Sequence, residues 1–165
     1  MQFHGLLSQF PKEVKLLIIA FVITLSIGFF TGISYVRITS TIQPNGIESN
    51  YLGNENDEEA EIMQFKKSEK EILTLIHNHI LSMSIIFLLL GGILSLTSMN
   101  KRLKTILMFE PFLSIVLTFG GIYILWSGVL WFKYIIMFSG MAMVLSFVFS
   151  VFYILKETIF SLKKV

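Results

Sequence analysis

The sequence contains no cysteine and is poor in charged residues. Without cysteine there is no disulfide, no thiolate metal site and no cysteine nucleophile. Only 15% of the 165 residues are charged and 54% are hydrophobic, whereas soluble domains carry about 25% charged residues. The 13 basic and 11 acidic side chains give a net charge of +2. No basic stripe is interleaved with aromatic residues, which argues against nucleic acid as a partner.

Catalytic signatures are also missing. The sequence has no glycine-rich phosphate-binding loop, no serine or cysteine triad motif and no HExxH zinc motif. No pair of carboxyl groups and no activated nucleophile stands out for acid–base or covalent catalysis. These absences favour a non-enzymatic role and leave an enzyme as the weakest alternative.

What the sequence has in abundance is apolar residues in long runs. A helix needs about 20 apolar residues to cross a bilayer, and four runs reach this length: 16–36, 72–98, 105–126 and 134–155. Backbone groups in lipid must be bonded within their own segment, so each run is expected to be helical. The N-terminus does not lead from a basic stretch into a short apolar core and a cleavage site, so we expect the first run to be retained. We predict an all-α integral membrane four-helix bundle that forms a single domain over residues 1–165.

Lysine and arginine flank the predicted spans unequally, and this inequality predicts the orientation. With four spans, three basic groups fall on one side of the membrane: Lys12 with Lys15, residues 101–104 and residues 156–164. The 101–104 connection weighs most, because positive residues in short loops stay in the cytoplasm. We therefore expect both termini in the cytoplasm and the loop 37–71 on the outer side of the membrane.

Within the extracytoplasmic loop 37–71, residues 50–61 are predicted to be solvated. Residues 50–61 are acidic and rich in turn formers, so they bury little. Ser68 and Glu71 have the spacing of a capping box, which predicts that the second helix begins before the membrane.

Small residues recur at helical spacing in the predicted spans, for example Gly28 and Gly32 in the first. Small residues let membrane helices approach closely, because lipid gives no hydrophobic drive between them. We therefore predict a compact bundle.

Two histidines, His77 and His79, open the second apolar run, which reaches Ser98 without another ionisable residue. A histidine inside a membrane helix is costly to bury and is therefore a candidate functional residue. Residues two apart point about 200° apart around a helix, so this pair does not readily chelate one metal ion. We expect His77, which shares a face with Ser84 and Gly91, to point into the bundle and His79 to point elsewhere.

Haem near the outer surface is the sharpest hypothesis for this pair. Met137 in the fourth span lies at comparable depth, and histidine with methionine is a known axial pair for haem iron. Arg37, just after the first span, is placed to bind a propionate through a bidentate bond. Copper also accepts histidine and methionine. The structural alternative is a shallow histidine hydrogen-bonded in the interfacial belt, and a proton relay is a further one.

Glu110 is the other intramembrane charge. It precedes Pro111, which is expected to kink the third span. In a functional interpretation, Glu110 admits protons or contacts a quinone head group. In the structural interpretation, which we favour, it reaches the interface or pairs there with Lys101 or Lys104.

Several stretches carry a resemblance to known proteins: IQPNGIESNYLGNE at 42–55, FKKSEKEIL at 65–73 leading into HNH at 77–79, EPFL at 110–113, and the glycine pair at 120–121. Over about residues 15–157 the chain resembles a family of small, functionally uncharacterised bacterial inner-membrane proteins with four spans and an H-x-H motif at the head of the second. The resemblance implies the fold and the location, and it carries no activity. The H-x-H motif is also similar to haem-ligand motifs of heme–copper oxidase and nitric oxide reductase subunits, although the further histidines of a complete oxidase site are missing here.

Three functions follow as hypotheses. The first is a non-catalytic subunit or accessory protein of an inner-membrane complex, for example a respiratory one, with haem bound through His77 and His79. Its partners would be the bilayer and either other membrane subunits or a second copy of this chain. The second is a metal or proton carrier, which requires polar residues through the full depth of the bundle, and residues 85–90 and 115–116 offer almost none. The third is a sensor or adaptor that acts through the acidic loop.

Overall fold

A computed structural model of the protein describes residues 5–40, 43–55 and 63–162. All regular structure in these ranges is helical. Four helices are long and apolar enough to cross a membrane, namely Lys12–Ile38, Glu69–Ser95, Lys101–Trp126 and Phe132–Leu162. The predicted all-α architecture with four membrane spans is confirmed.

The helices begin earlier than the apolar runs that predicted them, because polar residues form their first turns. The elements are a 3₁₀ turn at Leu6–Gln9, α1 at Lys12–Ser40, α2 at Pro44–Leu52, α3 at Glu69–Ser95, α4 at Lys101–Ile115, a π-helical turn at Val116–Gly120, α5 at Gly121–Trp126 and α6 at Phe132–Leu162. The third span is therefore built from α4, the π-helical turn and α5 in succession. Pro111 lies inside α4, which continues past it to Ile115 before the π-helical turn begins.

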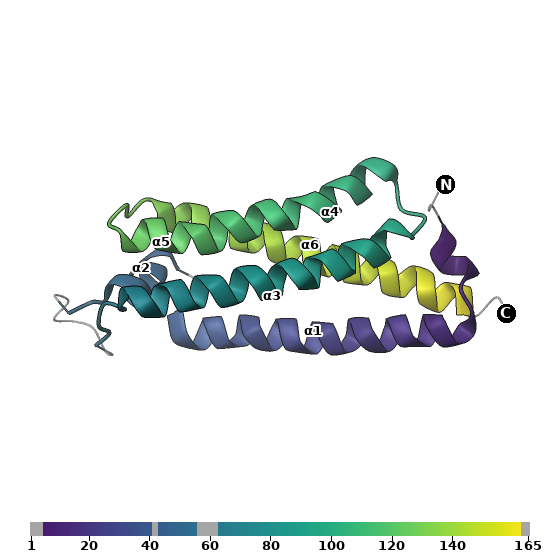
Figure 1. Cartoon of the computed structure of the whole chain (residues 1–165), viewed down its shortest axis with the longest axis horizontal. Coiled ribbons are helices and arrows are strands. Elements are labelled where there is room, and N and C mark those ends of the chain that lie inside the picture. Colours follow the sequence, from purple (N-terminus) through teal and green to yellow (C-terminus); the bar gives the residue numbers. More distant parts are fainter. Residues whose placement is uncertain (1–4, 41–42, 56–62, 163–165) are drawn as a thin grey trace.

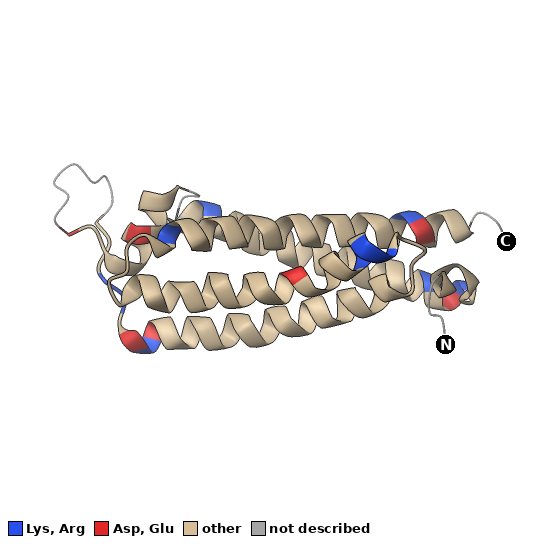
Figure 2. Ribbon diagram, turned by 90° about the horizontal axis from the view of Figure 1, so that it is seen from above, with Lys and Arg blue, Asp and Glu red and all other residues tan. Residues whose placement is uncertain are grey.

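The four spans form an elongated bundle in which α6 packs against each of the other three (Figure 1). The 3₁₀ turn and the last turns of α6 lie at one end of the bundle, and α2 and α5 lie at the other (Figure 1). Figure 2 shows that the lysines, arginines and acidic residues gather at these two ends, apart from acidic colour in the middle of the bundle. This distribution suits a bundle whose central part lies in lipid.

The centre of the bundle is held by stacked phenylalanines. Phe29 of α1 and Phe147 of α6 stack with their ring centroids 3.8 Å apart and their planes 6° apart. Phe87 of α3 meets both rings edge-on, at 6.3 and 6.2 Å, and Phe30 meets Phe147 in the same way. We call these four residues the aromatic cluster. Because lipid removes the hydrophobic drive between helices, such close ring packing is what joins α1, α3 and α6 here.

The connection between α3 and α4 is closed by polar contacts. Lys104 is buried, and its Nζ donates to the backbone carbonyl of Ser95 at 3.0 Å and to that of Thr97. These carbonyls lie at the C-terminal end of α3, where a cation satisfies groups that the helix leaves unpaired. Ser98 donates from its backbone N and its Oγ to the Glu157 carboxylate, at 2.7 and 2.8 Å. The connection between α3 and α4 is therefore hydrogen-bonded to the last turns of α6.

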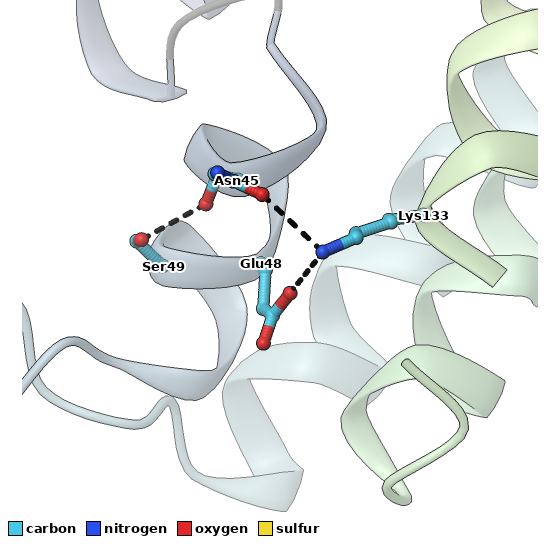
Figure 3. Close-up of polar contacts among 4 residues, drawn as sticks. All are labelled: Asn45, Glu48, Ser49 and Lys133. Carbon is cyan, nitrogen blue, oxygen red and sulfur yellow. Dashed lines mark hydrogen bonds and ion pairs between the residues drawn. The ribbon is translucent and has the colours of Figure 1, made fainter. Parts of the chain in front are cut away.

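At the other end, residues 43–55 fold onto the bundle, so the prediction of a solvated loop is wrong for residues 50–54, which are partly buried. The segment contains α2, and Lys133 at the start of α6 donates to Glu48 at 2.6 Å and to Asn45 at 3.3 Å (Figure 3). The structure does not describe residues 56–62, so the prediction for that stretch lies outside the described residues. We call residues 43–55 and 63–68 the α2 cap.

Backbone hydrogen bonds close the α2 cap. Asn54 N donates to Gln64 O at 2.9 Å, Gln64 N donates back to Asn54 Oδ1 at 2.6 Å, and Lys67 N donates to Tyr51 O at 3.2 Å. The indole Nε1 of Trp126 donates to Lys67 O at 2.8 Å, which joins the cap to α5. These four hydrogen bonds, two between backbone groups and two between a backbone group and a side chain, hold the cap on the bundle.

The capping box at the start of α3 is confirmed. Ser68 N donates to Glu71 Oε2 at 2.8 Å, and Glu71 N donates to Ser68 Oγ at 3.4 Å. Both contacts satisfy amide groups that a helix N-terminus leaves without intrahelical partners.

The glycines of α1 do not serve the compact packing that was predicted for them. Gly28 and Gly32 are exposed, and a Cβ added at either would meet no atom within 4 Å. The face of α1 that packs inward is instead formed by larger residues such as Val22 and Phe29. In α3, by contrast, Gly91 is buried as expected.

Candidate functional site

The histidines at the head of α3 have different surroundings, and the orientation predicted for them is wrong. His77 is exposed, whereas His79 is half-buried with its ring centroid 4.8 Å from that of Phe119. The buried stripe of α3 consists mainly of large residues, among them Ile72 and Leu90, and His79 lies seven positions after the first of these. Small residues misled the sequence argument, because large side chains fill this part of the bundle.

The hydrogen bond of His79 fixes which ring nitrogen is free. Its Nδ1 lies 2.8 Å from the backbone carbonyl oxygen of Leu75. A carbonyl oxygen only accepts, so Nδ1 carries the proton and donates it. The Nε2 of the neutral ring then keeps its lone pair, the arrangement in which histidine binds a metal or haem iron while its other nitrogen is held by a carbonyl. His79 is thus better prepared than His77 to act as a ligand.

The other residues named for the haem hypothesis lie on different helices. Met137 is half-buried on α6, which packs against α3, and Arg37 is exposed in the last turn of α1. Within residues 5–40, 43–55 and 63–162, no three histidine, aspartate or glutamate side chains come together to hold a metal ion. The haem hypothesis names Met137 of α6 as the second protein ligand beside His79.

Glu110 is held between two helices. Ser114 of α4 donates its Oγ–H to Glu110 Oε1, and Ser146 of α6 donates to Oε2. Both serines are buried, with exposed fractions of 3% and 5%. The favoured pairing with Lys101 or Lys104 is wrong, because the ammonium group of Lys104 binds the end of α3 and the one ion pair among the described residues joins Lys133 to Glu48.

From the sequence, Ser114 and Ser146 were small residues of the predicted packing faces and were not assigned to Glu110. The spacing of Glu110 and Ser114, one turn apart on α4, was the available signal for one contact. The contact with Ser146 joins residues 36 positions apart and depends on how α4 packs against α6.

Comparison with known proteins places this fold in a family. Residues 41–165 match a family described as a transmembrane helical domain. The chain belongs to this family of transmembrane helical domains. No curated protein and no solved structure shows a significant match to the chain. The predicted resemblance to a family of membrane helical proteins is thereby confirmed, and a multi-pass membrane protein follows from it.

The matched part of the transmembrane helical domain contains α2 to α6, and α1 precedes it. His79, Met137 and Glu110 lie within the match, and Arg37 lies outside it. The comparisons give no support to the similarity with haem-ligand motifs of oxidase and reductase subunits. The roles of the two histidines, Met137, Arg37 and Glu110 remain predictions.

Proposed function

We propose that this chain is a non-catalytic subunit or accessory protein of a bacterial inner-membrane complex, and that a membrane helix of a partner packs against α1. The observation that carries the proposal is the outward face of α1. Gly28 and Gly32 form a small-xxx-small pair, and no described atom outside their own stretch of α1 lies within 4 Å of either Cβ position. Exposed Thr24 continues this face one turn earlier.

Small residues on a membrane helix allow a second helix to approach closely. A glycine pair one turn apart leaves a shallow groove along a helix, and a second helix that enters it gains van der Waals contact between backbones. Lipid chains fill such a groove less well than a matching helix surface does. No helix of the described residues fills the groove, so the proposed occupant is a membrane helix of another protein.

Photo-crosslinking in native membranes tests the proposal. A benzophenone side chain placed at Thr24 should give adducts of defined mass with a partner, whereas the same group at Phe109 should not. Phe109 is a matched control because it is also exposed, at 68%, but lies on α4 and not on α1. Crosslinks of the same pattern from both positions, or none from Thr24, would overturn the proposed contact.

A pair of glycine substitutions gives a second test. Gly28→Leu should reduce recovery of the partner in mild detergent by about tenfold or more, because a loss of about 1.4 kcal/mol in packing corresponds to a tenfold weaker complex. Gly92→Leu is the control, since Gly92 on α3 is also exposed and has nothing within 4 Å of its Cβ position. Equal recovery with both variants would contradict the assignment of the α1 face.

Haem binding is the second candidate function, and the oriented ring of His79 favours it. With Nδ1 bound to Leu75 O, Nε2 is the atom that would bind iron. Bound haem would supply electron transfer near the outer surface, with Met137 as the candidate second ligand and Arg37 as the candidate partner of a propionate. A reduced-minus-oxidised spectrum of the purified protein is the test. His79→Ala should remove the Soret band and His77→Ala should leave it, whereas a flat spectrum of the unmodified protein would exclude haem.

A further inference from the structure

One carboxylate lies alone in the middle of the bundle. Glu110 is the only acidic residue of the sequence between positions 72 and 155. Figure 2 shows acidic colour on the ribbon between the two charged ends of the bundle. At about 1.5 Å per residue, Glu110 lies about 14 Å along the third span from Lys101 and about 24 Å from Trp126. Since the hydrocarbon core is about 30 Å thick, this places Glu110 inside it.

Among the residues that the structure describes, no opposite charge faces this carboxylate. On α3 there is no titratable side chain from Ile80 to Ser95, and on α6 there is none from Ile135 to Phe152. The nearest cation on α4 is Lys104, whose Nζ is bonded to carbonyls at the end of α3. An ionised carboxylate without a counter-charge is expensive in the membrane interior. Something outside the protein chain must therefore neutralise it.

The hydroxyl groups around Glu110 behave differently from most others in the spans. Elsewhere, serine and threonine hydroxyls donate to backbone carbonyls of their own helix, for example Ser26 to Val22 O and Thr158 to Ile154 O. Ser114 and Ser146 donate instead to the carboxylate, one from each of the two helices that flank it. Their arrangement is therefore directed at the carboxylate and brings four oxygen atoms together.

We propose that Glu110, Ser114 and Ser146 form a binding site for one exchangeable monovalent cation, either a proton or a sodium ion. One carboxylate supplies a single negative charge, which one monovalent cation neutralises. Carboxylate and hydroxyl oxygens are the kind of ligand that hard cations accept. This site lies between α4 and α6, away from the proposed contact on α1. It therefore goes beyond the proposed function, and its test is independent of the test of that function.

Buried hydroxyls continue the polar character on either side of the site. Towards α5, Thr118 and Ser139 share a hydrogen bond of 2.7 Å between their hydroxyl oxygens. Towards the other end, Ser150 of α6 is buried at 2% exposure one turn after Ser146. The polar depth that the sequence argument found missing in residues 85–90 and 115–116 is thus supplied by the facing surfaces of α4 and α6.

Labelling with dicyclohexylcarbodiimide tests the proposal on the unmodified chain. This apolar reagent couples to protonated carboxyl groups, and peptide mapping by mass spectrometry identifies the residue. We expect labelling of Glu110 that falls by about tenfold per pH unit at the alkaline end, as for a group that loses one proton. Sodium chloride should slow the labelling, relative to equal choline chloride, if the site takes sodium. No effect of sodium would assign the site to protons alone.

Two results would overturn the proposal. The first is no labelling of Glu110 at any pH in sodium-free solution. The second is labelling that is the same at every pH and salt composition, since a permanently protonated carboxyl group that only joins α4 to α6 would behave in that way.

A matched pair of variants tests the role of the hydroxyl groups. Ser146→Ala removes a donor to the carboxylate and should shift the proton or sodium concentration for half-maximal effect by about tenfold or more. Ser150→Ala removes a buried hydroxyl from the next turn of the same helix and should leave that concentration unchanged. Equal behaviour of the two variants would remove Ser146 from the site.

Discussion

Gly53 in the α2 cap provides the sharpest test of the structure outside the membrane. Its backbone has φ +81° and ψ 171°, a region that only glycine adopts readily, so Gly53→Ala costs about 1–3 kcal/mol in backbone strain. The added Cβ would also lie 2.7 Å from Lys66 N and 2.9 Å from Gln64 O. Both are backbone atoms, so the 63–68 segment must move away.

The combined cost is about 3 kcal/mol, which lowers the ratio of docked to undocked cap by about 100-fold. Amide hydrogen exchange followed by mass spectrometry measures this ratio, because the amides of Asn54, Gln64 and Lys67 are bonded within the cap. We expect their exchange to accelerate by about the same factor in Gly53→Ala.

Gly128→Ala is the matched control. Gly128 also has a positive φ, +110°, but nothing lies within 4 Å of its Cβ position, and it belongs to the connection between α5 and α6. It should show backbone strain without displacing the cap, so exchange of the cap amides should stay close to that of the unmodified protein. Unchanged protection in Gly53→Ala, or an equal loss in both variants, would refute the described packing of residues 63–68.

Three further predictions concern packing, pH and orientation. Phe147→Ala removes three ring contacts of the aromatic cluster, each worth about 0.5–1.5 kcal/mol. It should lower the free energy of unfolding in mixed micelles by about 2–4 kcal/mol. Phe149→Ala is the control, because Phe149 is 51% exposed, and it should have little effect. Burial raises the pKa of Tyr51 to about 12, whereas the pKa of tyrosine in an unfolded chain is about 10. The contribution of Tyr51 to stability is therefore complete below pH about 10 and falls as pH rises towards about 12. Tyrosinate absorbance, compared with that of Tyr51→Phe, measures this loss. Because the chain has no cysteine, a single cysteine introduced at Ser8 or at Ser127 is the only thiol that an impermeant maleimide can label. We expect the two positions to react from opposite sides of the membrane, with position 8 reacting from the cytoplasm. Labelling of both from one side would contradict the topology.

The spans and the start of α3 were predictable because local sequence decides them. Length and apolar composition are sufficient for a membrane helix, since lipid accepts no unsatisfied backbone. The Ser68 and Glu71 capping box needs only contacts within three residues. Neither depends on how distant parts of the chain pack.

The α2 cap was missed because its sequence looks like that of a solvated loop. A local signal did exist: Pro44 stands at the first position of the helix and Gly53 just beyond its end, the asymmetry typical of helix boundaries. What holds the segment in place is distant, however. Lys133 lies 85 positions after Glu48, and no periodicity in residues 43–55 reveals that partner.

The membrane interior shows most clearly where sequence reasoning ends. For His79 the residue type was informative, but its orientation depended on which stripe of α3 faces the bundle. For Glu110 we expected a counter-charge close in sequence, because ion pairing is the common way to stabilise a buried carboxylate. The structure supplies hydroxyl donors from α4 and α6 instead. Hydrogen bonds from neutral groups stabilise a carboxylate without cancelling its charge, so the free energy of burying Glu110 falls further when a cation binds. The packing of α4 on α6 is therefore coupled to the occupancy of the proposed site.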